Sequence, residues 1–147
     1  MKRSRMLFPV LVLAGAGAIA AAPAQAGGFP LTAQLAAANE VGQQGDVGAT
    51  GSAAITLNQG QAEICFDLDL SGLTTPPTRA HIHRGVAGAN GPVVADFFET
   101  GEPVVTEGCV PAAESLIKEI RKNPAGFYVN IHNATAPAGA VRGQLTP

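Results

Sequence analysis

Tryptophan is absent from this 147-residue sequence, and tyrosine, cysteine and histidine are rare, with one, two and three copies respectively. Both methionines, Met1 and Met6, lie within the first six residues. A blue-copper centre uses two histidines, a free cysteine and usually an axial methionine, so the rest of the chain is a poor match to that class. No serine stands in a Gly-x-Ser-x-Gly elbow, which disfavours the nucleophile of an α/β-hydrolase.

Positive charge is also scarce, and three of the nine basic residues lie at the very start of the chain. Lys2, Arg3 and Arg5 precede an apolar run over residues 6–22, and Ala24-Gln25-Ala26 then supplies small residues at the positions that a signal peptidase reads. This pattern predicts a signal peptide over residues 1–26, cleaved after Ala26, and export by the general secretory route. We therefore expect a secreted or periplasmic protein with one folded domain over residues 27–147.

The expected mature chain is acidic. It keeps six basic residues against eleven acidic ones, which gives a formal charge near −5. The only basic cluster is a short one at residues 118–122. Nucleic acid and anionic membrane surfaces are therefore disfavoured as partners.

The two cysteines, Cys65 and Cys109, are predicted to form a disulfide, because a lone pair in an exported chain usually does so. Such a bond would stabilise the fold by about 4 kcal/mol in the chain-entropy description. Two free buried thiols, or one thiolate that binds a metal, remain the alternatives. Alternation places Cys65 on the acidic face of its strand, so we expect the disulfide to fasten a crossing segment over the outside of a sheet.

Hydrophobic alternation predicts a chain made almost entirely of strands. The clearest pattern covers residues 61–70, where Ile64, Phe66, Leu68 and Leu70 share one face and acidic residues share the other. One helix is predicted over residues 111–123, because a proline opens it, bases crowd its last turn and Asn123-Pro124 ends it. Seven or eight short strands and one helix indicate a β-sandwich or barrel. The other predicted strands cover residues 29–35, 51–57, 79–85, 92–98, 104–110, 127–132 and 140–145.

The histidines form the best candidate site. His81 and His83 lie two residues apart in one predicted strand, so both imidazoles face the same side, and His132 lies in a neighbouring predicted strand. Three imidazole nitrogens can bind zinc or copper. The count of three is too small for the two-metal site of a copper-zinc superoxide dismutase, and residues 84–92 lack the glutamate that a cupin places after its histidine pair.

Two other interpretations of the histidines stay open. They can form a hydrogen-bonded polar cluster that fixes the sheet register, with Asn130 on the face of His132 and arginines paired to Asp67 or Asp69. They can also bind zinc with an open coordination position and so support hydrolysis. The pattern alone does not choose between structure, metal binding and catalysis.

Five motifs follow one another along the chain: Asp67–Leu73, Ala80–Gly85, Asn90–Val94, Tyr128–His132 and Val141–Leu145. In this order they resemble the CHRD domain, a module named after chordin and also found in bacterial secreted proteins. The resemblance covers about residues 31–145 and implies an all-β, Greek-key-like antiparallel sandwich or barrel. One departure is the segment after Glu40-Val41, where members of the family usually carry proline.

Residue patterns and resemblance together predict a secreted CHRD-like domain that is not an enzyme. We expect a binding or interaction module with a structural histidine cluster and an extracellular protein or surface as its partner. The alternative is a mononuclear copper or zinc protein that uses His81, His83 and His132 as ligands.

Overall fold

The computed structural model describes residues 27–147, so the signal peptide predicted for residues 1–26 lies outside the described residues. Eight strands, one α-helix and three short 3₁₀ turns make up this part of the chain. The helix α1 is Glu114–Lys122, and the turns are η1 (Ala37–Asn39), η2 (Gln59–Gln61) and η3 (Pro124–Gly126). The strands are β1 (Phe29–Ala36), β2 (Thr50–Asn58), β3 (Glu63–Ser71), β4 (Pro77–Arg84), β5 (Val93–Phe98), β6 (Glu107–Pro111), β7 (Phe127–Asn133) and β8 (Val141–Gln144).

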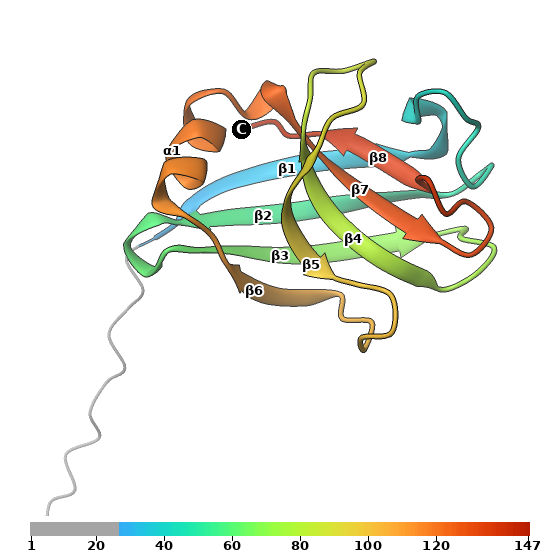
Figure 1. The fold of residues 1–147 in the computed structure, drawn as a ribbon, viewed down its shortest axis with the longest axis horizontal. Coiled ribbons are helices and arrows are strands. Elements are labelled where there is room, and N and C mark those ends of the chain that lie inside the picture. The colour runs from blue at the N-terminus through green and yellow to red at the C-terminus, as the bar shows by residue number, and fades with distance from the viewer. Residues whose placement is uncertain (1–26) are drawn as a thin grey trace, which may run out of the picture.

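All eight strands belong to one antiparallel sheet in the order β5-β4-β7-β8-β1-β2-β3-β6. Hairpins join neighbours, while the connections from β3 to β4, β5 to β6 and β6 to β7 cross between strands that are not neighbours, as in Greek-key folds. The sheet curls so that its two edges approach each other (Figure 1). Phe97 of β5 stacks on Phe66 of β3 with ring centroids 4.2 Å apart. The predicted all-β fold is confirmed, as a nearly closed barrel.

The barrel interior is the hydrophobic core. In β3, Ile64, Phe66 and Leu68 are buried as their alternation predicts. Helix α1 lies across one end of the barrel (Figure 1), where Ile117 and Ile120 join the core. The helix begins three residues later than predicted, because Pro111 still belongs to β6.

The disulfide between Cys65 and Cys109 is confirmed, with an S–S distance of 2.04 Å. The expectation that it fastens a crossing segment over the sheet is wrong, because the two cysteines are directly opposite each other in the β3–β6 ladder. Alternation gives the face of a residue but not its partner strand, which is why the sequence could not place β6 at the sheet edge. The thiol and thiolate alternatives are excluded with the bond formed.

Strand β7 differs from the other strands because both of its faces are buried. Phe127, Val129 and Ile131 point into the core. Tyr128, Asn130 and His132 are also buried, although they lie on the outer face. Loops therefore cover the outer face of the sheet at β4 and β7, and the histidines lie under this cover.

Candidate metal centre

The antiparallel pairing of β4 and β7 brings the three histidines together. His81 lies opposite Asn130, His83 opposite Tyr128, and His132 opposite Arg79, all on the outer face of the sheet. The histidines are 2%, 9% and 5% exposed. Each offers a ring nitrogen within 4.8 Å of those of the other two. The convergence expected from alternation is therefore observed.

Each imidazole is held by a hydrogen bond from one of its two nitrogens. His83 Nδ1 lies 2.9 Å from the carbonyl oxygen of Gly91, and His132 Nδ1 lies 3.1 Å from that of Pro137. His81 Nε2 lies 2.9 Å from a carboxylate oxygen of Glu99. Since these oxygens only accept, the bonded nitrogen of each neutral ring carries the hydrogen. The second nitrogen of each ring is then a lone-pair donor.

These second nitrogens have no hydrogen-bond partner among the described residues. They are His81 Nδ1, His83 Nε2 and His132 Nε2, and all three are buried. A buried polar atom without a partner costs about 1–3 kcal/mol. Three such atoms from three converging side chains are what a metal ligand set presents before the metal binds.

Burial also favours the neutral form of two of the imidazoles, those of His132 and His83. Desolvation, assisted by the neighbouring charge of His81, lowers the pKa of His132 to about 4. Desolvation also lowers the pKa of His83. Because metal ligation needs the unprotonated nitrogen, both side chains are in the ligating form at neutral pH.

One carboxylate, that of Glu99, contacts the histidines, and another, that of Glu40, lies beside Asn130. Burial acts to raise the pKa of Glu99, but the hydrogen bond and charge of His81, with smaller contributions from Asp96 and Arg79, together lower it below its ordinary value. Burial raises the pKa of Glu40 to about 7, and the Arg142 charge and the Asn130 side chain offset part of this effect. The sequence does not predict Glu40 and Glu99 as site residues, because both lie in loops and no spacing relates either of them to a histidine.

A stack of three side chains fixes one side of the cluster. The His83 ring stacks on Tyr128 with centroids 4.8 Å apart, and the Arg142 guanidinium lies 3.6 Å from the Tyr128 centroid on the ring face. Arg142 also donates to Asn90 Oδ1 and to the carbonyl oxygen of Ala89. The arginine thereby ties the loop over residues 85–91 to the sheet and holds the carbonyl oxygen that orients His83.

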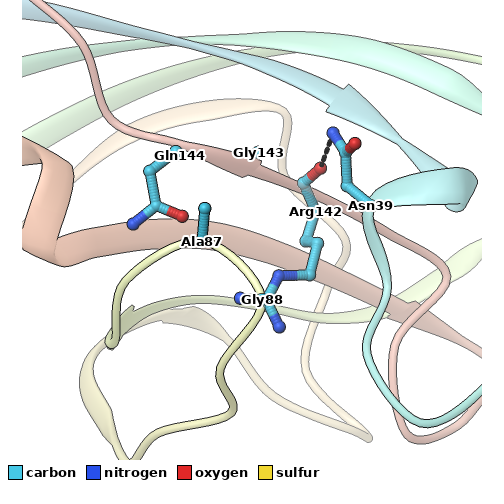
Figure 2. A pocket seen from close by; sticks show the side chains of 6 residues that line it. All are labelled: Asn39, Ala87, Gly88, Arg142, Gly143 and Gln144. Atoms are coloured by element: carbon cyan, nitrogen blue, oxygen red, sulfur yellow. Dashed lines mark hydrogen bonds between the residues drawn. The ribbon is translucent and has the colours of Figure 1, made fainter.

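A shallow pocket of about 330 Å³ lies beside this arginine, between η1, β8 and the loop. Figure 2 shows the Arg142 side chain reaching toward Gly88 from the floor of the pocket, while Asn39 donates to the Arg142 carbonyl oxygen. None of the residues that line this pocket is a histidine, cysteine or carboxylate. The pocket therefore contributes to loop packing and offers no metal ligand.

The predicted pairing of arginines with Asp67 or Asp69 is wrong. Arg79 donates to the carbonyl oxygen of Pro137, and Arg84 forms an ion pair with Glu119. The two aspartates lie on β3, which is separated from β7 by three other strands in the sheet order and from β4 by four. Period two could not exclude this pairing, because it gives no information on which strands are neighbours.

The donor set suits a borderline transition metal. Three imidazole nitrogens fit Zn²⁺ or copper, whereas Ca²⁺ and Mg²⁺ prefer oxygen ligands. Metal-bound histidines typically donate their other N–H to a carboxylate or a backbone carbonyl, as all three do here. The residues present therefore fit such an ion.

Comparisons with known proteins agree with the fold. A family model described as CHRD domain matches residues 31–145. No curated protein and no solved structure matches the chain. Among residues 27–147, no helix is long and apolar enough to span a membrane.

Proposed function

Because the chain belongs to the CHRD domain family, we propose that it is an exported member whose role is to bind one transition-metal ion through His81, His83 and His132. The observation that carries this proposal is the set of three buried, unpartnered ring nitrogens on converging side chains. A cluster that served only to fix the sheet register would pair those atoms. The metal-binding interpretation is therefore preferred over the structural one.

Copper and zinc are the candidate metals. For nitrogen ligands the affinity of divalent ions is highest for Cu²⁺, and Zn²⁺ accepts a three-histidine set readily. Glu99 accepts the second N–H of His81 and makes that ring a more basic ligand. We infer binding of either ion, with Cu²⁺ the tighter of the two.

Export is part of the proposal. The Cys65–Cys109 disulfide suits an oxidising compartment such as the periplasm or the extracellular space. The signal sequence proposed for residues 1–26 would deliver the chain there. A partner protein or surface outside the cell remains compatible with metal binding, since it would use other faces of the barrel.

The test is a calorimetric titration of chelator-stripped protein with Cu²⁺ and with Zn²⁺. We expect one stoichiometric site in the wild type and its loss in His83→Ala. Asp67→Asn is the matched control, because Asp67 is an exposed potential ligand on another strand. No stoichiometric site in the wild type, or an unchanged site in His83→Ala, would refute the proposal.

A further inference from the structure

We propose, resting on the metal site above, that the bound metal keeps a fourth coordination position that faces Asn130 and exchanges small ligands with solvent. Zinc sites that keep an open position have three protein ligands and one water or substrate molecule. Among the described residues, the histidine cluster contains three ligating side chains and no fourth. The resident fourth ligand is a water molecule that other small ligands can replace.

Asn130 lies where a fourth ligand would be held. It is directly opposite His81 in the β4–β7 ladder and two residues before His132 on the same strand. Its neighbour Tyr128, two residues back, lies opposite His83. Asn130 is therefore the one position on this face that adjoins all three histidines.

The chemistry of Asn130 indicates what kind of ligand faces it. Its side chain is 4% exposed, and its Oδ1 has no hydrogen-bond partner. The amide also interacts with Glu40, and the ionised Glu40 carboxylate accepts from the NH₂ side of the amide. This contact leaves Oδ1 free to accept a hydrogen bond from an O–H group, as a metal-bound water would provide.

A pocket supplies the route to this position. It measures about 360 Å³ and reaches both His83 and Asn130. The loop over residues 41–43 and Asn90-Gly91 form its other walls, and Ala138 lies at its rim. The pocket accommodates water and small anions, and its polar walls suit them better than an apolar ligand. The expected ligand is therefore a small oxygen-containing molecule or a small anion that binds the metal directly.

Azide competition against the bound water tests the proposal in the Cu²⁺-loaded protein. We expect azide to produce a saturable charge-transfer absorption and to abolish the enhancement of water-proton relaxation by the copper. A loaded wild-type protein that shows neither signal overturns the open position and leaves the metal site intact. Failure to load copper at all would instead refute the proposed function.

Two variants with opposite expected effects locate the position. Ala138→Phe fills the mouth of the pocket and should weaken azide binding about tenfold or more while copper affinity stays unchanged. Ala134→Phe places the same ring in the same turn outside the pocket lining and should change neither quantity. Equal azide binding by both variants would show that the ligand arrives by another route and would overturn the proposal.

Asn130→Ala tests the role of Asn130 as the acceptor of the water hydrogen bond. Azide has no hydrogen to donate, so the loss of the acceptor destabilises bound water alone. We expect the apparent affinity for azide to rise about fivefold, the value of one ordinary hydrogen bond. A purely structural asparagine would leave azide affinity unchanged or lower it, and either result contradicts the assignment of Asn130.

Discussion

Strand β7 contributes adjacent residues to two buried polar clusters. The clusters differ in how many of their polar atoms have a hydrogen-bond partner. Asn133 belongs to the first cluster, where it donates to Asp46 Oδ2 at 2.6 Å and accepts from the Ala136 amide at 2.8 Å. Asp46 Oδ2 also accepts from the amide and hydroxyl of Thr74. His132, the preceding residue, belongs to the second cluster, where one nitrogen of each histidine has no partner.

The difference is the one expected between a structural network and the proposed metal site. The Asp46 cluster joins three loops by hydrogen bonds that are complete within the chain, so nothing more is needed to stabilise it. The histidine cluster has the same depth of burial but three lone pairs without donors. The proposed metal ion would complete it. The two clusters are therefore expected to respond differently to metal, acid and substitution.

The largest expected effect is stabilisation by metal. Copper or zinc at about a thousand times its dissociation constant should raise the free energy of unfolding by about 4 kcal/mol, because only the folded chain holds the three ligands together. The increase should be present in the wild type and in Asn133→Ala and absent in His132→Ala. Urea unfolding with and without metal measures it. Equal stabilisation of His132→Ala would place the metal elsewhere.

The second prediction concerns acid. The pKa of His132 is about 4 in the folded protein and near 6.5 when unfolded, so the unfolded chain binds more protons between these values. The metal-free protein should therefore lose up to about 3 kcal/mol as the pH falls from 6.5 to 4. The free energy of unfolding should be measured as a function of pH in the Glu40→Gln variant. The raised pKa of Glu40 would otherwise increase stability as the pH falls over much of this range.

Acid should affect the Asp46 cluster in a different pH range. The Thr74 amide hydrogen bond holds the pKa of Asp46 below its ordinary value of 3.8. Its stabilising contribution is present above that value and is lost only at lower pH. The free energy of unfolding, measured from pH 7 to pH 2, should therefore decline in two separate stages. In His132→Ala the stage between pH 6.5 and pH 4 should shrink, and an unchanged stage would contradict the assignment.

The third prediction is a loss of stability that metal does not influence. Asn133→Ala removes one of the three donors to Asp46 Oδ2 and leaves the Ala136 amide without its partner, which should lower the free energy of unfolding by about 2 kcal/mol. The loss should be the same with and without saturating zinc. Gln61→Ala, at an exposed residue, is the control and should have almost no effect. If zinc reversed the loss of stability, the two clusters would belong to one site and the prediction would be wrong.

The sequence predicted the fold well because alternation is a local property. Each strand was located to within a few residues, and the shared face of His81 and His83 followed from their spacing alone. Partner strands were harder to assign, as Cys109 and the arginines show, because strand order depends on contacts distant in sequence. The loops that cover the histidines could not be predicted. Glu40 and Glu99 lie in such loops, and hydrophobic periodicity does not indicate the path of a loop.

The smallest expected effect concerns the hydrogen bond behind the metal ligand. Glu99 accepts from His81 Nε2 at 2.9 Å, and Asp96 lies 3.7 Å from the same nitrogen. Glu99→Gln keeps an oxygen acceptor but removes the charge, so His81 becomes a weaker ligand. We expect metal affinity to fall about tenfold, at the low end for the loss of a hydrogen-bond partner of a metal-binding histidine. Apo stability should stay unchanged, because the carboxylate is half exposed. Asp96→Asn should lower metal affinity less, because the Asp96 carboxylate lies farther from His81 Nε2. A larger loss in Asp96→Asn than in Glu99→Gln would show that Asp96 is the carboxylate that supports His81.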